Sequence, residues 1–227
     1  MENNLANLME NKWNDLHLKE RFQLKYPNEH LIRFIFSQFP RGLSERGKIR
    51  ILDLGCGSGP HTVFLAEEGF QVYATDISNN GLNVTEKRLK SSGLKAVLKN
   101  ADMENQPFED NFFDGVVSFG VFYYNDRSGY QKAVGELHRV LKKGGRAFVF
   151  TRTTDDYRFG KGKEIERNTF ILDISETSEQ NMAMHFLDRE GINEVFSSFE
   201  EITVEKNETT FSNLKNKNSD WIIKLKK

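Results

Sequence analysis

The chain has 227 residues, and its 32 Lys and Arg nearly balance 33 Asp and Glu, which leaves a net charge of -1. This length suits one hydrophobic core, and the balanced charge gives no electrostatic reason to expect nucleic acid or a membrane surface as a partner. The single cysteine, Cys56, excludes an internal disulfide, and no His/Cys spacing is typical of a metal site. No apolar run reaches the roughly 18 residues of a membrane span, and the polar start is unlike a signal peptide. We therefore expect a cytoplasmic protein without a metal, and the sequence leaves its oligomeric state open.

Apolar residues at helical spacing predict helices over residues 11–40, and strand and helix patterns alternate from residue 48 onward. Strands are expected at residues 49–54, 71–75, 96–98, 114–119 and 146–151. The helices between them are expected at residues 62–68, 81–91 and 131–141. Strands that alternate with helices favour a parallel sheet covered on both faces.

The regular alternation ends after Thr151. The charged segment 155–167 is expected to be a loop, and residues 169–174 and 182–186 are expected to pair as a hairpin. A helix over 188–199 and two strands, 201–205 and 221–226, complete the prediction. We divide this single domain into a helical cap (1–47), a cofactor-binding core (48–153), an insertion (154–187) and a final helix and hairpin (188–227).

The most informative segment is Asp53-Leu54-Gly55-Cys56-Gly57-Ser58-Gly59-Pro60, at the end of the first expected strand. Glycines there permit a sharp turn and a close approach of the backbone to a ligand, and the helix N-terminus that follows suits an anionic group. A dinucleotide-binding loop would carry Gly or Ala at the position of Pro60, and a phosphate-binding P-loop would need Gly-Lys-Ser/Thr. The segment therefore argues against both of these nucleotide classes.

Two acidic residues follow at the ends of the next two expected strands. Asp76 lies about 20 residues beyond the glycines, where an acid accepts hydrogen bonds from the hydroxyls of an adenosine ribose. Asp102 is placed to accept from the adenine amine, with Met103 packing on the ring. The alternatives are ordinary ones: a helix N-terminal acid for Asp76 and a turn-forming acid for Asp102.

The segment from Ile51 to Gly59 resembles the signature loop of class I S-adenosylmethionine-dependent methyltransferases. Asp76, the step Ala101-Asp102-Met103, the strand Phe113–Ser118 and the segment Leu137–Gly145 follow in that family's order. The opening segment, with Trp13 and Tyr26-Pro27-Asn28-Glu29, is similar to members of its small-molecule, bacterial-type branch.

This resemblance implies a doubly wound, Rossmann-like sheet of seven strands, parallel except for the last-inserted strand. It implies S-adenosyl-L-methionine as cofactor, S-adenosyl-L-homocysteine as product, and Gly55, Gly57 and Gly59 beneath the methionine portion. Asp53 would orient the loop. The full set of expected cofactor contacts is Asp53, Gly55, Cys56, Gly57, Gly59, Asp76, Ile77, Ala101, Asp102, Met103, Phe119 and Tyr26.

The methyl acceptor is expected to be a small molecule that receives the methyl group in-line on an O, N or C atom. His185 and Tyr124 are the candidate catalytic residues, since a base is needed only when the acceptor carries a proton that must leave early. The expected acceptor-binding residues are Tyr123, Tyr124, Arg152, Tyr157 and His185. The N-terminal helices and the insertion are expected to cover the cleft as a lid and to supply most of the acceptor pocket.

Three alternatives stay open at this point. A cofactor-binding sensor or scaffold without catalysis would share the fold. A methyltransferase directed at macromolecules is less favoured, because Ser118-Phe119-Gly120-Val121 stands where many such enzymes carry Asp/Asn-Pro-Pro-aromatic. An oxidoreductase with a dinucleotide is disfavoured by Pro60.

Overall fold

A seven-stranded sheet forms the centre of the computed structural model, which describes residues 2–175 and 177–227, with side chains from residue 9 onward. Its strands are β1 (Arg50–Leu54), β2 (Gln71–Asp76), β3 (Val97–Asn100), β4 (Phe113–Phe119), β5 (Leu141–Arg152), β9 (Glu201–Phe211) and β10 (Asn216–Lys226). Their order in the sheet is β3-β2-β1-β4-β5-β10-β9. Strands β1 to β5 pair in parallel, and β10 pairs antiparallel with both β5 and β9. The Rossmann-like methyltransferase fold implied by the sequence is therefore confirmed.

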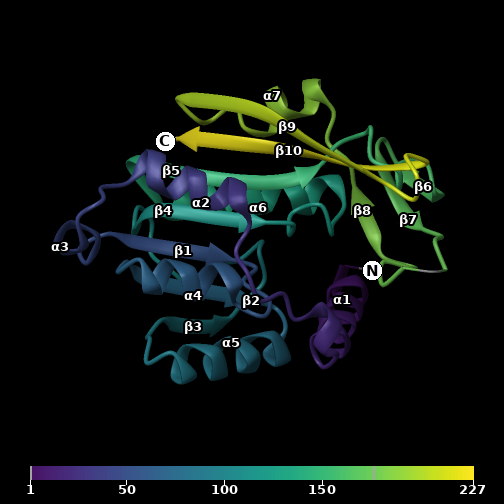
Figure 1. Cartoon of the computed structure of the whole chain (residues 1–227). Coiled ribbons are helices and arrows are strands. Elements are labelled where there is room, and N and C mark those ends of the chain that lie inside the picture. Colours follow the sequence, from purple (N-terminus) through teal and green to yellow (C-terminus); the bar gives the residue numbers. More distant parts are fainter. Residues whose placement is uncertain (1, 176) are drawn as a thin grey trace.

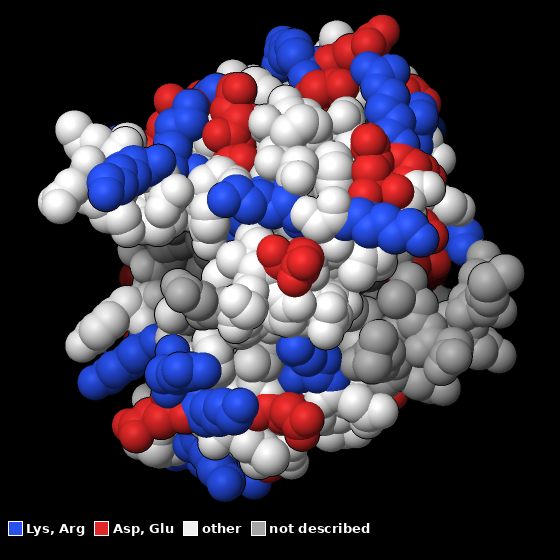
Figure 2. Space-filling model, turned by 90° about the vertical axis from the view of Figure 1, so that its right-hand side faces the viewer, with Lys and Arg blue, Asp and Glu red and all other residues white. Residues whose placement is uncertain are grey.

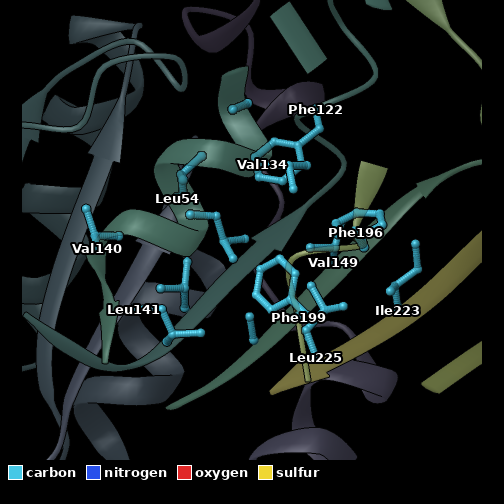
Figure 3. Close-up of a cluster of buried hydrophobic side chains, with 14 of the residues drawn as sticks. Leu54, Phe122, Val134, Val140, Leu141, Val149, Phe196, Phe199, Ile223 and Leu225 are labelled. Carbon is cyan, nitrogen blue, oxygen red and sulfur yellow. The ribbon is translucent and has the colours of Figure 1, made fainter. Parts of the chain in front are cut away.

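Helices cover both faces of this sheet, because alternate side chains of each strand point to opposite sides. Ile51 packs with α2 (Glu29–Gln38) and α4 (Pro60–Glu67), while its neighbour Leu52 packs with α6 (Arg127–Val140) and α7 (Arg189–Val195). Figure 3 shows the second of these clusters, where Phe196 and Phe199 meet Val149 of β5 and Ile223 of β10. The helix α5 (Asn79–Ser91) lies beside α4 and covers β2 and β3.

Four helices begin at a polar N-cap residue whose side chain accepts a hydrogen bond from the first turn. Asn28 accepts from the backbone N–H of His30, and Ser78, Asp126 and Asp188 each accept from the N–H of a glycine three residues on. Such caps satisfy N–H groups that have no partner inside the helix. The helices α5 and α6 start beyond the carboxyl ends of β2 and β4, so their capped ends lie at that edge of the sheet.

The segment after β5 differs in part from the sequence prediction. Residues 162–166, expected to be a loop, form β6 (Gly162–Glu166), which pairs with β7 (Thr169–Leu172). The expected hairpin is confirmed, since β7 pairs antiparallel with β8 (Ala183–His185). All residues of β6 are exposed, so no buried face imposed the alternation that reveals a strand in a sequence.

Besides α2, three helices precede β1: the 16-residue α1 (Glu2–His17) and the short η1 (Glu20–Phe22) and α3 (Leu43–Arg46). Figure 1 shows α1 and the small sheet β6-β7-β8 at the end of the molecule toward which β1, β4 and β5 point. Figure 2 views that end, where basic and acidic side chains are interleaved. None of the helices in the described part of the chain is long and apolar enough to span a membrane.

Candidate active site

The glycine loop between β1 and α4 needs its glycines for two separate reasons. Gly55, Gly57 and Gly59 all have positive φ angles, of 75°, 53° and 81°, which other residues rarely adopt. A Cβ on Gly55 would lie 2.3 Å from Cγ2 of Val121, and one on Gly59 would lie 2.5 Å from Oγ1 of Thr85. The loop is thus pressed against its neighbours on one side, and its backbone faces a cavity on the other.

Asp76 joins this loop to the end of β2. Its Oδ2 accepts a hydrogen bond of 2.7 Å from the backbone N–H of Gly57, and its Oδ1 accepts one of 2.8 Å from the N–H of Ser78. Burial raises the pKa of this carboxyl, against the opposing effect of the two amides and of His17. Each carboxylate oxygen keeps a further lone pair, and Asp76 lines the cavity.

Asp53 performs a structural task one layer deeper. It is buried, and the hydroxyl of Thr62 on α4 donates to its Oδ2 at 2.6 Å, which fixes the first turn of α4 on β1. Burial raises the pKa of Asp53 to about 7. Asp53 does not line the cavity, so its position fits the expected loop-orienting role and not direct contact with a ligand.

A turn after β3 supplies the third acidic residue. Asp102 accepts from the N–H of Glu104 at 2.9 Å through Oδ1, and the side-chain amide of Gln106 donates to its backbone carbonyl. Both Asp102 and Met103 line the cavity. Asp102 therefore does form the turn that the sequence offered as an alternative. The turn also holds Asp102 at the cavity wall.

The cavity has a volume of about 550 Å³, within the range of ligand pockets, roughly 300–1,000 Å³. It brings together most of the expected cofactor contacts, namely Gly55, Cys56, Gly57, Asp76, Ile77, Ala101, Asp102, Met103 and Phe119. Gly59, like Asp53, is not part of the wall, since it turns the chain into α4 behind the loop. Tyr123, Tyr124 and Arg152 line the same cavity, so the two groups of residues share one space.

Aromatic rings and one guanidinium form the wall near β5. The rings of Tyr123 and Tyr124 lie 4.5 Å apart, and the ring of Trp13 from α1 stands edge-on to Tyr124 at 4.8 Å. The guanidinium of Arg152 lies over the ring of Tyr123, at 5.4 Å from its centroid, and its Nη1 donates to Asp220 at 2.6 Å. This wall combines planar apolar surface with a few fixed polar groups, which is typical of small-molecule sites.

Comparison with known proteins identifies the domain that holds most of this geometry. Residues 51–145 match the family model described as a methyltransferase domain, and this segment holds the glycine loop, Asp76 and Asp102. A methyltransferase structure from Methanosarcina mazei, described as S-adenosylmethionine-dependent, superposes with a TM-score of 0.71 over 90% of this chain and 99% of its own, at 23% identity. Residues 51–145 thus carry a methyltransferase domain, and the chain as a whole has the fold of the Methanosarcina mazei enzyme. A methyltransferase of the same description from Mesorhizobium loti has a TM-score of 0.65 at 15% identity, covers 88% of this chain and 99% of its own, and shares the fold.

Curated relatives are similar to this chain over about half of its length or less. A demethylmenaquinone methyltransferase from Thermus thermophilus is 37% identical over 108 residues, which are 46% of this chain and 48% of the relative. A ubiquinone/menaquinone biosynthesis C-methyltransferase from Vibrio cholerae is 39% identical over 107 residues, or 44% of this chain and 40% of the relative. The chain thus spans half or less of the length of these curated relatives.

The residues that line the cavity fit S-adenosylmethionine. The loop backbone passes close to the cavity without Cβ atoms at Gly55 and Gly57, which leaves room for the methionine portion. Asp76 keeps free lone pairs for ribose hydroxyls, and no hydrogen bond to Oδ2 of Asp102 from the described residues competes with an adenine amine.

Besides Asp53 and Gly59, three further residues predicted for the site do not line the cavity. Tyr26 is 76% exposed and does not reach the wall, because the chain between η1 and α2 carries it outward. Tyr157 packs its ring against Phe211 near the far end of the β9–β10 hairpin. His185 lies behind the wall, where Nδ1 is 2.7 Å from Oγ1 of Thr169, and burial lowers its pKa to about 4. It does not line the cavity, so this position does not fit the expected role of His185 as a base for an acceptor bound there.

The structure also reveals residues of α1 that sequence reasoning missed. Nδ1 of His17 lies 3.0 Å from the hydroxyl of Ser78, and Oδ1 of Asn14 accepts from the backbone N–H of Asn80 at 3.1 Å. His17 and Trp13 both line the cavity. Residues 13, 14 and 17 share one helix face, and beyond the resemblance at Trp13 this spacing was the signal in the sequence.

Proposed function

We propose that this methyltransferase transfers a methyl group from S-adenosylmethionine to a small molecule bound against Tyr123, Tyr124 and Arg152. The observation that carries the proposal is the single cavity that joins this wall to Gly55, Asp76 and Asp102. An activated methyl group and its acceptor must share one space for in-line transfer, and a sensor for the cofactor alone has no use for the second wall.

The chain's own contribution is positioning. When bound, S-adenosylmethionine supplies an electrophilic methyl group on a sulfonium. The glycine loop, Asp76 and Asp102 would fix that molecule at three points, and the aromatic wall would orient the acceptor. Alignment of two reactants can supply roughly 7–11 kcal/mol of a barrier, so a reaction of this kind needs few groups that take part chemically.

The acceptor is proposed to be a planar, largely apolar molecule. Met9, Trp13, Phe22, Tyr123 and Tyr124 surround the acceptor end, and ring faces of this kind favour planar ligands. Relatives that share the core are named for the methylation of demethylmenaquinone. Reduced naphthoquinones are therefore the first acceptors to test.

We propose that fewer segments cover the cavity than the sequence suggested. Among the N-terminal helices, α1 supplies Met9, Trp13 and His17, whereas α2 packs into the core beside β5. The insertion supplies Ala183 to the wall and otherwise forms a second layer behind it. A lid, in this proposal, consists of α1 and η1, supported by β8.

Calorimetric titration and methyl-transfer assays test the proposal together. We expect S-adenosylhomocysteine and S-adenosylmethionine to bind, NAD not to bind, and label from the methyl group to appear in 1,4-naphthalenediol or a related reduced naphthoquinone. Tight binding of NAD without binding of S-adenosylmethionine would refute the cofactor assignment. Cofactor binding without transfer to any compound of a metabolite extract would favour the sensor.

A further inference from the structure

Glu179, in the turn between β7 and β8, reaches the wall of the cavity from behind. Its side chain is buried, and its Oε1 accepts a hydrogen bond of 3.1 Å from the phenol of Tyr124, 55 residues earlier in the chain. Its Oε2 accepts one of 2.6 Å from Nε of Arg158. Both oxygens of this carboxylate therefore accept a hydrogen bond, one from Tyr124 of the cavity wall and one from Arg158.

Arg158, which donates to Oε2 of Glu179, is itself held in place. Nη1 of Arg158 donates to Asp156 at 3.0 Å and to the side-chain oxygen of Asn218 on β10 at 3.1 Å. The turn that carries Glu179 is tied as well, since the N–H of Met182 donates to the carbonyl of Glu179 at 3.0 Å. The carboxylate is thus fixed in position and in orientation before any acceptor binds.

An ionised carboxylate only accepts hydrogen bonds, so the phenol of Tyr124 must be the donor in this contact. Its hydrogen is then committed to Glu179, and the lone pairs of Oη are left for the neighbouring hydroxyl of Tyr123 and for the cavity that Tyr124 lines. Burial raises the pKa of Tyr124 well above 10, so the phenol keeps its hydrogen at neutral pH. A hydroxyl that would otherwise donate or accept is restricted here to accepting.

We propose that Glu179 is a positioning residue that makes Tyr124 a hydrogen-bond acceptor for an O–H or N–H group of the methyl acceptor. The inference rests on the proposed function and narrows its substrate class to molecules with such a donor beside the planar ring. Ethers and carbonyl compounds of the same shape would place lone pairs against those of Oη and bind less well.

Replacement of Glu179 by glutamine offers a specific test, because Arg158 dictates how the amide must turn. Nε of Arg158 needs an acceptor, so the amide oxygen of Glu179→Gln faces Arg158 and its NH₂ faces Tyr124. The amide then donates to Oη, and the phenol hydrogen turns toward the cavity. The variant reverses the hydrogen bond that Tyr124 offers, whereas Tyr124→Phe removes it.

The experiment measures the binding of phenol and of anisole, an ether without a donor, to protein saturated with S-adenosylhomocysteine, by ligand-observed NMR titration. We expect Tyr124→Phe to lower the preference for phenol over anisole by about three- to tenfold through weaker binding of phenol, the effect of one hydrogen bond. We expect Glu179→Gln to lower it by a similar factor, but through tighter binding of anisole. A gain of affinity for the ether is a result that loss of a structural anchor cannot produce.

Asp173→Asn is the matched control, since Asp173 is an exposed acid of the same insertion that only accepts from Gln180. It should leave both affinities unchanged. Equal weakening of both probes in Glu179→Gln, or an unchanged preference in Tyr124→Phe, would overturn the inference, as would failure of the unmodified protein to bind phenol. Calorimetric binding of S-adenosylhomocysteine is measured in parallel, so that failure of the proposed function is recognised separately.

Discussion

Asp76→Asn is the substitution that most directly examines the cofactor site. The two oxygens of Asp76 accept from the N–H groups of Gly57 and Ser78 at 2.7 and 2.8 Å. An asparagine side chain has one oxygen, so its NH₂ must oppose one of these two donors or turn away from it. The same change removes the negative charge from the group proposed to accept hydrogen bonds from ribose hydroxyls.

A hydrogen bond to a charged group contributes about 1.5–3 kcal/mol, which corresponds to about a 10- to 150-fold rise in the dissociation constant of S-adenosylhomocysteine. The free energy of unfolding should change less. Burial raises the pKa of Asp76, so the folded protein holds the ionised form at a cost, and a neutral amide relieves that cost while it loses one hydrogen bond. Asp76→Ala is a poorer test, because it leaves two buried N–H groups without an acceptor, at about 1–3 kcal/mol each.

Isothermal titration with S-adenosylhomocysteine and urea unfolding of the same preparations measure the two quantities. Asp114→Asn serves as the control, since Asp114 also accepts from a backbone N–H, that of Arg50 at 2.9 Å, but lies at the start of β4, outside the cavity wall. Its cofactor affinity should match that of the unmodified protein. If Asp76→Asn binds as tightly as Asp114→Asn, the ribose assignment is wrong.

Three further predictions follow from the same geometry. Gly55→Ala should lower both the free energy of unfolding and cofactor affinity, because its Cβ would lie 2.3 Å from Val121 at a φ of 75°; Gly55→Ala that unfolds and binds like the unmodified protein would contradict this. Burial raises the pKa of Asp53 from an ordinary 3.8 to about 7, so its contribution to stability is complete below pH 3.8 and is lost as the pH rises to 7, by roughly 4 kcal/mol at most. Urea unfolding between pH 4 and 7.5 should show that decline, and Asp53→Asn should reduce it; identical pH profiles would refute the assignment. Deletion of residues 1–18 should weaken binding of S-adenosylhomocysteine and leave the far-UV circular dichroism of the sheet intact. The helix α1 contacts α5 and the cavity, and none of its described side chains, from Met9 onward, belongs to the two main core clusters. Unchanged affinity would show that α1 is no part of the site.

Local patterns in the sequence were sufficient for the cofactor-binding core. The alternation of strands and helices between Lys48 and Thr151 predicted a parallel sheet, since buried strands and amphipathic helices each leave a period in the chain. The glycines predicted a turn at the end of β1, because a backbone with positive φ limits the residue at those positions. Asp76 and Asp102 followed, because parallel strands end at one edge of a sheet and the acids stand at two such ends.

The limits of the sequence lie where function depends on contacts between distant segments. Nothing near His185 indicated that Thr169 would hold its ring behind the wall, and nothing near Tyr26 indicated that its side chain would be exposed. The strand β6 escaped prediction because all its residues are exposed, so that pairing with β7 alone decides its conformation.

The division between local sequence signals and tertiary contacts is clearest at the cavity wall formed by Tyr123, Tyr124 and Arg152. Tyr124 was a candidate from its place after β4, but the direction of its hydroxyl depends on Glu179, which reaches it only because β7 and β8 fold back over the carboxyl edge. His17 and Trp13 join the wall only because α1 packs against α5. The spacing of apolar residues and the presence of a glycine determine the conformation of the few residues around them, so both can be recognised in the sequence. A hydrogen bond across 55 residues depends on how whole elements pack, and only the tertiary structure decides it.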